Sequence, residues 1–490
     1  MSTITPAASV MLTRDPGSRS IYAILRGSQL RFFGGFWAFP GGKLTETEAA
    51  DTDALPARRL AACRELFEET GVLVARTPDG QFPRIDDEMS RCRKAILDEH
   101  LAFEQFLAQR SLTIRPGDFA CVGEITTPAF AQLRYATTFF VAHLPNGQEA
   151  TIWPGELERG EWLDSADLLG RWRRSEVLLT PPSAMSLMGL GDRPIGDAPA
   201  LLGPLFENLA RGAIHPILFA PDVQLIPLKT VALPPSNYTN AYLVGSGPRY
   251  LIDPGCHEPA EQQRLFDVID AGQPPTAIVL THHHPDHIGA AEACARRYRI
   301  PIWAHARTAE KLASLVDVQR FLNDGDRLDL GPSPAHAGPW RLEALFTPGH
   351  ASGHLAFFEP FYRLLFAGDM ISTLSSMVIA PPDGHLGDYL KSLRRLRELP
   401  ARLLLPSHGN VSARLIEVID AALAHRVKRE TQLLEALGSG PIGIDELTQQ
   451  MYRGTPEPLM RFARAQVLAG LLKLQAEGRA HPADAERWQA

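Results

Sequence analysis

A short apolar segment in the second half of the chain, Ala277–Leu280, runs directly into the histidine-rich sequence T-H-H-H-P-D-H. An apolar run of this length with a polar loop behind it predicts a buried strand that ends at the loop. In an extended segment, residues two apart point to the same side. His282 and His284 are therefore predicted to bind one metal ion, while His283 points elsewhere.

Two more ligand candidates follow at once, Asp286 and His287, where the chain turns toward a helix predicted over Ala290–Tyr298. This turn lets them face a second ion. Imidazole nitrogens and carboxylate oxygens suit zinc, and also iron or manganese. A lone histidine is usually a surface or hydrogen-bonded residue, and some His-rich tracts are tags. A tag does not lie in mid-chain behind a strand, so the pattern indicates a metal site.

Three further candidates lie downstream, each in a loop that contains glycine. His350 lies in T-P-G-H-A-S-G-H, Asp369 in L-L-F-A-G-D-M and His408 in L-L-L-P-S-H-G. Asp369 and His408 each follow an apolar strand. Because a rigid sheet delivers side chains to its edge in this way, we expect these residues to meet the histidine-rich loop.

These residues resemble the metallo-β-lactamase superfamily, whose H-x-H-x-D-H signature the chain matches position by position, within a region of about residues 223–420. The resemblance implies a four-layer αβ/βα sandwich with the site at one edge. It gives Asp253 a structural role and places His354 beside the ligands rather than among them. It also implies one metal held by His282, His284 and His350 and a second held by Asp286, His287 and His408, with Asp369 bridging.

The chemistry expected of such a centre is hydrolysis. Two divalent cations about 3.5–4 Å apart can share a hydroxide at neutral pH, which would attack an ester, thioester, amide or phosphodiester, with Asp286 counted as catalytic as well as ligating. Dinuclear zinc β-lactamases place a Cys in the second site, and flavodiiron proteins carry a Glu at the position of His284, so both are disfavoured. The pattern is closer to glyoxalase-II-type thioesterases and to β-lactamase-like endoribonucleases.

A second motif, R-E-L-F-E-E-T-G-V, lies at residues 64–72 in a helix predicted over Pro56–Thr70. At helical spacing Glu65, Glu68 and Glu69 share one face, where like charges repel each other. A hard divalent cation such as Mg²⁺ or Mn²⁺ would relieve this repulsion. The alternative is a solvated acidic helix face, which the pair of adjacent glutamates alone would favour.

The residues around this helix resemble the Nudix hydrolases over about residues 5–195, most of all the coenzyme A diphosphatase-like branch. The R-E-U-x-E-E-x-G-U half of the Nudix signature, with U an apolar residue, matches fully, and Gly42 and Glu48 satisfy its G-x5-E half. Eight extra residues separate the two halves, which puts a role for Glu48 in doubt. The resemblance implies an α/β/α sandwich and assigns metal binding and catalysis to Glu65, Glu68 and Glu69.

The length of 490 residues corresponds to about three domains of ordinary size. Nine of the residues from 191 to 221 are Gly or Pro, which suggests a linker at 196–222. The expected fold is therefore an α+β multidomain chain: a Nudix-like domain at 5–195, a metallo-β-lactamase-like domain at 223–424 and a winged-helix-like domain at 425–490. In the last part, phosphate contacts could come from Arg426, Lys428, Arg429, Arg461, Arg464 and Lys473.

Three functions follow from these motifs. The first is a hydrolase with two active sites, acting on a small-molecule thioester or nucleoside-diphosphate conjugate such as acyl-coenzyme A. The second is an RNA-processing endoribonuclease, and the third a regulatory or binding protein with a degenerate Nudix domain. The net charge of −7, five scattered cysteines and the absence of a signal peptide or bilayer-spanning stretch predict a cytoplasmic protein without a membrane partner.

Overall fold

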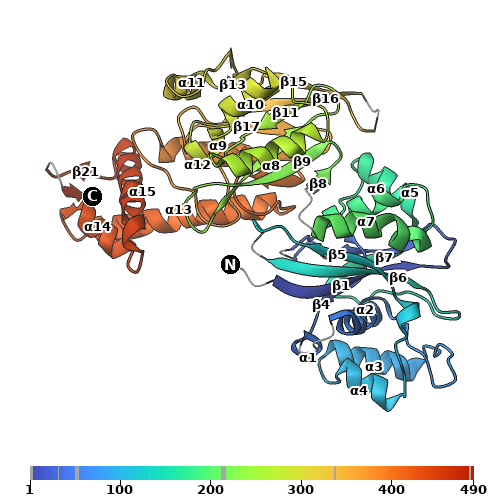
Figure 1. Ribbon diagram of the computed structural model, residues 1–490. Helices are drawn as coiled ribbons and strands as arrows, with labels where there is room; N and C mark the ends of the chain where they lie inside the picture. The colour runs from blue at the N-terminus through green and yellow to red at the C-terminus, as the bar shows by residue number, and fades with distance from the viewer. Residues whose placement is uncertain are drawn as a thin grey trace. The chain divides into compact units, whose positions relative to one another are not determined.

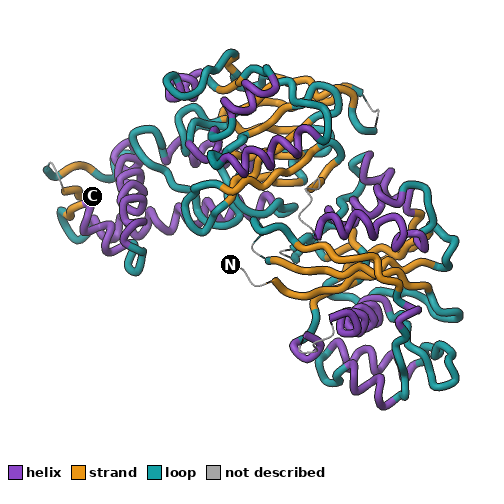
Figure 2. The backbone as a smooth tube through the Cα atoms, viewed as in Figure 1, coloured by secondary structure: helices purple, strands orange, loops and turns teal. Residues whose placement is uncertain are grey.

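The computed structural model describes residues 4–30, 32–49, 54–131, 133–210, 217–335, 338–484 and 487–490. The chain divides into two compact units, Met1–Pro221 and Asp222–Ala490, which we call unit 1 and unit 2 and describe separately. Figure 1 labels their helices and strands, and Figure 2 shows that both units mix helices with strands.

Unit 1 is built on one mixed sheet. Its strands are β1 (Ile4–Thr13), β2 (Ser20–Arg26), β3 (Trp37–Ala38), β4 (Gly41–Lys43), β5 (Ala120–Thr126), β6 (Arg134–His143) and β7 (Leu157–Asp164). The central order is β3-β2-β1-β6-β5, with β4 paired to β1 and β7 to β2. The long strands β1 and β6 run parallel to each other. The short β4, which contains Gly41 and Gly42, pairs with β1 and precedes the first helix of the chain.

Helices cover both faces of this sheet (Figure 1). One layer holds α1 (Glu46–Ala49), α2 (Ala54–Thr70), α3 (Asp87–Leu97) and α4 (Phe103–Gln109); the other holds α5 (Ser165–Arg173), α6 (Pro181–Leu190) and α7 (Ala198–Ala210). Because successive side chains of a strand alternate between faces, β1 contributes Val10 and Leu12 to one core and Met11 to the other. Unit 1 is therefore an α/β/α sandwich.

Two predictions for unit 1 differ from the structure. Helix α7 lies inside the expected linker and packs Leu202 and Phe206 into the core, so the Gly and Pro content of 196–222 does not mark a simple linker. The sequence also predicts a single helix over roughly Glu88–Gln109, and the structure forms two helices there, α3 and α4. The chain leaves α3 at Asp98, and Glu99 adopts a left-handed conformation with φ of 57°, which ends the helix.

Unit 2 begins with two facing sheets. The first runs in the order β14 (Arg320–Phe321), β13 (Ile302–Ala304), β12 (Ala277–Val279), β11 (Tyr250–Ile252), β10 (Tyr238–Val244) and β9 (Val223–Lys229). The second runs in the order β15 (Arg327–Pro332), β16 (Pro339–Phe346), β17 (Leu355–Glu359), β18 (Leu364–Gly368) and β19 (Leu403–Pro406). Tyr242 of the first sheet and Phe366 of the second meet edge to face at 5.1 Å between ring centroids.

Each sheet packs a helical layer on its other face. The first core includes Leu265 of α8 (Pro259–Asp270) and Cys294 of α10 (Ala291–Tyr298). The second includes Leu393 of α12 (Leu386–Arg397) and Ile419 of α13 (Leu415–Leu437). Short helices α9 (Pro285–Ile288) and α11 (Ala306–Leu312) lie in the connections. The order of layers is helix, sheet, sheet, helix, as predicted.

The C-terminal elements form a small winged helix. They are α14 (Ile444–Met451), α15 (Glu457–Ala476) and the strands β20 (Ile442–Gly443), β21 (His481–Pro482) and β22 (Arg487–Gln489), which pair in the order β20-β22-β21. Helix α13 serves two cores, because Ile419 packs with α12 while Leu433 packs with α15. The expected boundary at 424 thus falls within a continuous helix.

The predicted α+β multidomain class is confirmed. Among the described residues, no helix combines the length and apolarity required to cross a bilayer. The five cysteines are free thiols.

Candidate functional site

The histidine-rich loop follows β12, as predicted, and its second half is helix α9. His284 is the N-cap residue of α9, and Asp286 and His287 lie within it. The change from extended chain to helix at His284 explains why the four side chains divide into two pairs. His283 points away from the others and lies 3.7 Å from Asp383, measured from Nε2 to Oδ2.

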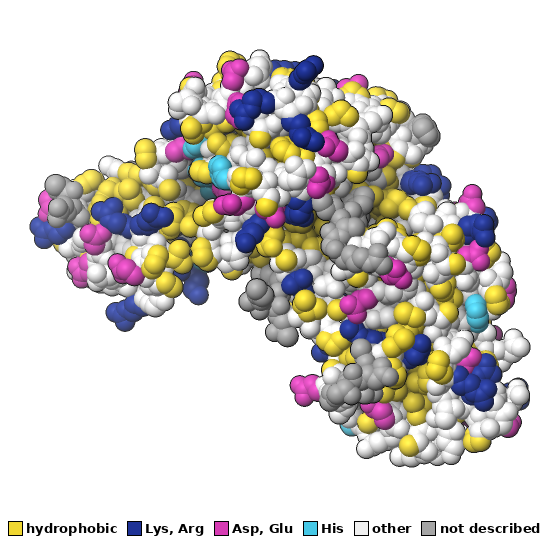
Figure 3. Space-filling view, in the orientation of Figure 1, with side chains coloured by type: hydrophobic (Ala, Val, Ile, Leu, Met, Phe, Trp, Pro, Cys, Tyr) yellow, Lys and Arg dark blue, Asp and Glu magenta, His cyan; other side chains and the backbone are white. Residues whose placement is uncertain are grey.

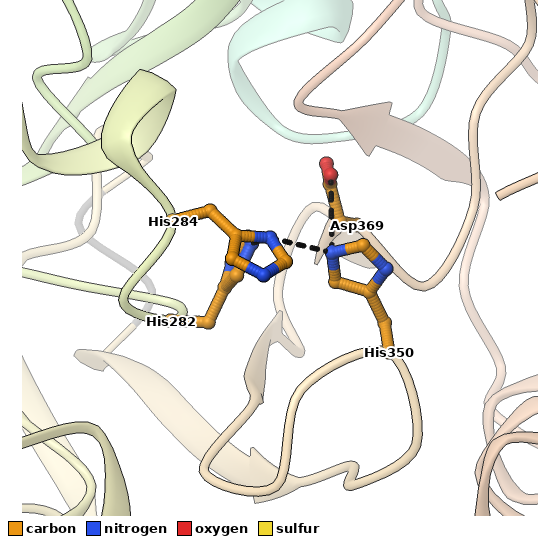
Figure 4. A group of neighbouring side chains, drawn as sticks. All are labelled: His282, His284, His350 and Asp369. Atoms are coloured by element: carbon orange, nitrogen blue, oxygen red, sulfur yellow. Dashed lines mark hydrogen bonds and ion pairs between the residues drawn. The ribbon is translucent and has the colours of Figure 1, made fainter. Parts of the chain in front are cut away.

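The other three candidates come from the second sheet. His350 lies between β16 and β17, Asp369 follows β18 directly and His408 follows β19. Since β18 and β19 run parallel, Asp369 and His408 emerge at the same edge. Figure 4 shows His282 and His284 on one side, and His350 and Asp369 facing them from segments of the second sheet.

Four of these side chains form the first group: His282, His284, His350 and Asp369. His284 Nδ1 lies 2.9 Å from His282 Nε2 and 2.9 Å from His350 Nε2. His350 Nε2 lies 3.5 Å from Asp369 Oδ2. One ligand atom from each residue lies within 4.8 Å of all the others, so three nitrogens and one oxygen surround a common point.

The second group is Asp286, His287 and His408. Asp286 Oδ2 lies 3.4 Å from His408 Nε2 and 3.9 Å from His287 Nε2. The second oxygen of Asp369, Oδ1, lies 3.3 Å from His408 Nε2 and 3.5 Å from His287 Nε2. Asp369 therefore presents one carboxylate oxygen to each group, which is the geometry expected of a bridging residue.

The outward nitrogens of four rings have partners of their own. The Nδ1 atoms lie 2.8–2.9 Å from these oxygens: Thr281 Oγ1 for His282, Asp253 Oδ2 for His287, the Val378 carbonyl for His350 and the Tyr238 carbonyl for His408. An Nδ1–H that donates outward leaves Nε2 as a free electron pair facing inward. Such outer partners are typical of metal-binding histidines.

The pKa values of the histidines shift in opposite directions in the two groups. Burial and the neighbouring imidazoles hold the pKa of His282 well below its usual value and lower that of His284 to about 3. Burial would also lower the pKa of His408, but Asp369 and Asp286 outweigh it and raise the pKa to about 10. At His287, too, neighbouring aspartates, of which Asp369 is the strongest, outweigh burial and raise the pKa well above its usual value. The histidines of the first group are thus neutral donors, whereas His287 and His408 of the second group lie beside the charged carboxylates of Asp286 and Asp369.

The site fits divalent cations on two further observations. His287 Nε2 and Asp369 Oδ1 are buried without a hydrogen-bond partner, which is costly for polar atoms in a protein interior. The set of nitrogen and carboxylate donors suits zinc, iron or manganese. Both atoms face the second group, where a bound cation would satisfy them.

Asp253 and His354 contact residues of the two groups. The fully buried Asp253 accepts the backbone N–H of Thr281 at 2.8 Å and its hydroxyl at 2.6 Å, which ties the start of the histidine loop. The Nε2 of His354 accepts the backbone N–H of Asp369 at 3.1 Å. Gly368 allows this approach, because a Cβ there would lie 2.4 Å from His354 Nε2. His354 thus lies behind Asp369 and is a member of neither group.

The sequence did not predict the hydrogen-bond partners of the histidines that lie outside the motifs. Ser236 lies 3.2 Å from His408 Nδ1 through its hydroxyl, and the carbonyls of Tyr238 and Val378 orient His408 and His350. Backbone carbonyls leave no trace in residue identity. Ser236 lies in a Pro-rich loop far from the histidine motif, so no spacing pointed to it.

The acidic helix face of unit 1 is also organised. Arg64 donates to Glu65 at 2.9 Å and to Glu68 at 3.0 Å, and its Nε donates to the buried Glu48 at 2.8 Å. Glu69 accepts the backbone N–H of Gly41 at 2.7 Å. Despite the longer loop, Glu48 therefore joins the same cluster, as a partner of Arg64.

Burial raises the pKa values of the three glutamates. The pKa of Glu69 lies well above its usual value because of burial and the nearby Glu65, and the pKa of Glu68 is raised to about 7. Gly42 packs directly on Glu65, since a Cβ there would lie 2.4 Å from a carboxylate oxygen. In the part of the chain that the structure describes, these three carboxylates do not converge as closely as the two histidine-rich groups do.

The basic residues proposed for nucleic-acid contacts are mostly engaged. Arg426 is buried, and Lys473 is bonded to Glu430 at 2.5 Å with its side chain 12% exposed. Arg464 pairs with Asp445. In the face shown in Figure 3, dark blue and magenta side chains lie interspersed over the C-terminal elements. Arg426 and Lys473 are therefore not available for phosphate contacts at the surface.

Two known protein families match separate parts of unit 2. The family described as the metallo-beta-lactamase superfamily matches residues 235–408, and the beta-lactamase associated winged helix domain matches residues 444–488. A beta-lactamase-like protein 2 homolog of Drosophila melanogaster is 30% identical over 264 residues, covering 49% of this chain and 83% of the relative. A hydroxyacylglutathione hydrolase of Thermosynechococcus vestitus is 33% identical over 238 residues, covering 45% of this chain and 88% of the relative.

One similar solved structure is that of a Nudix hydrolase from Alicyclobacillus acidocaldarius. It is 26% identical, covers 41% of this chain and 98% of its own chain, and has a TM-score of 0.36.

Proposed function

Because the chain belongs to the metallo-β-lactamase superfamily of hydrolases, we propose that its two histidine-rich groups form a dinuclear metal centre that hydrolyses an acyl thioester or ester. The observation that carries this proposal is the position of Asp369, whose two oxygens face the two groups. Zinc is the first candidate metal, with iron and manganese as alternatives.

Each of the two groups would hold one cation. His282, His284 and His350 would hold one cation, Asp286, His287 and His408 the other, and Asp369 both. When bound, such cations supply Lewis acidity, which lowers the pKa of water and polarises the carbonyl under attack. The carboxylate of Asp286 lies at the more exposed side of the second group, where it can also orient a water molecule and accept its proton.

A thioester is the favoured substrate class. The Thermosynechococcus relative is named a hydroxyacylglutathione hydrolase, and an acylglutathione is a thioester. The first test is release of thiol from an acylglutathione and from an acyl-coenzyme A by the full chain loaded with zinc. We expect turnover that disappears on chelation and returns with zinc. Thiol release that persists in the metal-free protein would contradict the proposal.

A second candidate activity belongs to unit 1, where α2 presents three half-buried glutamates beside Arg64 and Glu48. We propose Nudix-type cleavage of a nucleoside-diphosphate conjugate such as coenzyme A, with Mg²⁺ or Mn²⁺ held by Glu65, Glu68 and Glu69. An acyl-coenzyme A contains both the pyrophosphate and the thioester that the two units would cleave. Incubation with Mg²⁺ should release a nucleotide fragment from coenzyme A. A protein that binds coenzyme A without cleaving it would instead have a degenerate, regulatory unit 1.

RNA cleavage by unit 2 is the remaining alternative, and the winged helix is the observation in its favour. Binding to RNA through phosphate contacts weakens steeply with salt. We expect little affinity for single-stranded RNA above moderate salt, because several of the basic side chains are buried or paired. Strong, steeply salt-dependent RNA binding followed by cleavage would favour the endoribonuclease.

A further inference from the structure

A backbone carbonyl, that of Val378, fixes the orientation of His350. It lies 2.8 Å from His350 Nδ1 and accepts a hydrogen bond from Nδ1–H, which leaves Nε2 free to face the first group. Val378 belongs to the loop between β18 and α12, which has no regular secondary structure at this point. The position of this carbonyl therefore depends on what holds its two neighbours in the chain.

Both neighbours are held by side chains from the C-terminal helices. Gln466 of α15 donates from Nε2 to the Met377 carbonyl at 2.9 Å, and its Oε1 accepts the Ile379 N–H at 3.2 Å. Arg426 of α13 donates to the same Met377 carbonyl and, at 3.2 Å, to Gln466 Oε1. The amide of Gln466 thus bonds to the residues on both sides of Val378. Its nitrogen donates one hydrogen bond and its oxygen accepts two.

The surroundings make this arrangement rigid. Arg426 is 7% exposed and lies over the ring of Tyr389, 5.2 Å from its centroid. The Tyr389 hydroxyl donates to the carbonyl of Met370 at 3.0 Å, and Met370 directly follows Asp369. The same buried network therefore touches the loops of two metal-site residues.

Gln466 lies within the stretch matched by the winged-helix family, residues 444–488. Its helix joins the core of the hydrolase layer through Ala469, which packs with Leu390 and Leu393 of α12. The C-terminal domain is thus anchored near the site by an apolar contact and contributes one polar side chain to the loop that orients His350.

We infer that Gln466 is a positioning residue for the metal centre, so that the winged helix helps to set the affinity of the first group for its cation. This inference rests on the proposed dinuclear function. Its physical basis is the chain of contacts from Gln466 through the Met377 and Ile379 peptides to the Val378 carbonyl and His350. Loss of an outer partner of a metal-binding histidine typically lowers metal affinity by about 10–100-fold.

The test compares Gln466→Met with Gln475→Met in the full chain. Methionine keeps the volume and the helix but removes all three hydrogen bonds of the Gln466 amide. Gln475 is exposed on the same helix, so its substitution controls for a change from glutamine to methionine on α15. For the metal-free proteins we would measure zinc affinity by competition with a chromogenic chelator, the Co²⁺ absorption spectrum and the urea unfolding midpoint.

We expect zinc affinity to fall about 10–100-fold in Gln466→Met, with an altered Co²⁺ spectrum, and to stay within about threefold of the parent in Gln475→Met. Gln466→Glu can still accept from Ile379 and Arg426 but cannot donate to Met377, so its affinity should lie between the two. A Gln466→Met protein with parental zinc affinity and Co²⁺ spectrum overturns the inference, even if its unfolding midpoint is lower. A purely structural role would move only that midpoint.

Two other outcomes can be distinguished from a loss of positioning by Gln466. If the parent protein itself binds neither zinc nor iron nor manganese, the proposed function fails and the inference falls with it. If Gln466→Met does not give a folded near-ultraviolet spectrum, Gln466→Asn replaces it. Asparagine retains the amide but is one methylene too short to reach both peptides, so the same fall in zinc affinity is expected and an unchanged affinity overturns the inference.

Discussion

At the scale of single residues, Asp253 links the start of the histidine-rich loop to His287. Its carboxylate accepts the Thr281 backbone and hydroxyl and also faces His287 Nδ1 at 2.8 Å. It does so from a left-handed conformation with φ of 49°, which Asp and Asn tolerate better than most residues. A buried acceptor with three donors can be replaced only at a cost.

Substitution of Asp253 by asparagine isolates this role, because the backbone conformation remains accessible. The amide must either turn its NH₂ toward His287 or lose one of the Thr281 bonds. We expect zinc affinity to fall about 10–100-fold and the metal-free protein to lose about 1–3 kcal/mol of its free energy of unfolding. Chelator competition and urea denaturation measure the two quantities. Asp267→Asn, on the exposed face of α8, is the matched control; equal behaviour of the two variants would argue against the role.

The raised pKa of Glu68, about 7, predicts a pH dependence of metal binding in unit 1. A cation binds only the ionised carboxylate, so protons compete with it below that pKa. The affinity for Mn²⁺ should therefore rise up to about tenfold per pH unit below 7 and level off above it. In the absence of metal the sign for stability is the opposite, since a carboxyl with a raised folded-state pKa loses stabilisation as pH rises through about 7.

Calorimetric titration with Mn²⁺ between pH 5.5 and 8.5 measures this dependence, and buffers of different ionisation enthalpy count the protons released. Glu68→Gln should bind more weakly and show a flatter pH profile. A parent protein whose Mn²⁺ affinity does not change across this range would contradict the predicted role of the acidic cluster.

At the scale of secondary structure, α13 is the element that joins the sandwich of unit 2 to the winged helix. Leu433 near its end is 2% exposed and packs in the C-terminal core, while Val427 on the same helix is 65% exposed. Leu433→Ala should lower the free energy of unfolding by about 2–4 kcal/mol. Val427→Ala should change it by no more than about 0.5 kcal/mol. Hydrogen exchange should show lost protection in 444–488 for the first variant only; equal protection in both would refute a shared helix.

The sequence also predicted most elements that carry the site, for identifiable reasons. Strand β12 and helix α10 have clear apolar patterns on either side of the histidine loop, and the strand-end positions of Asp369 and His408 followed from apolar runs before a glycine. The break between α3 and α4 was missed because it depends on one left-handed residue, Glu99, in a stretch with continuous helical periodicity. Helix α7 was missed because Pro204 and the nearby glycines suggested a linker, although a buried Phe206 decides its packing.

For the candidate site, the sequence predicted which histidine and aspartate side chains lie close together. Its two groups are the ones assigned from the motif and its resemblance. What could not be predicted are the partners that hold these residues: the carbonyls of Val378 and Tyr238, and Gln466 from far along the chain. Backbone groups are identical in every residue, so only the fold reveals which of them faces a histidine.

At the scale of the whole molecule, the two units have separate cores and separate candidate sites. We therefore expect the two proposed activities to be lost independently. Glu69→Gln should reduce release of a nucleotide fragment from acyl-coenzyme A by at least about 100-fold and leave thiol release within about twofold of the parent. Asp369→Ala should do the reverse. The assay follows both products by chromatography; joint loss in either variant would show that the sites depend on each other.

The central claim is that unit 2 holds a pair of divalent ions with Asp369 between them. Elemental analysis of the purified full chain, with Asp369→Ala prepared in parallel, measures this most directly. We predict two divalent ions per chain in the groups around Asp369, apart from Mg²⁺ or Mn²⁺ in unit 1, and a clear loss in the variant together with loss of thioester hydrolysis. A parent protein free of transition metal that still hydrolyses the thioester, or a variant with parental metal content and turnover, would contradict the claim.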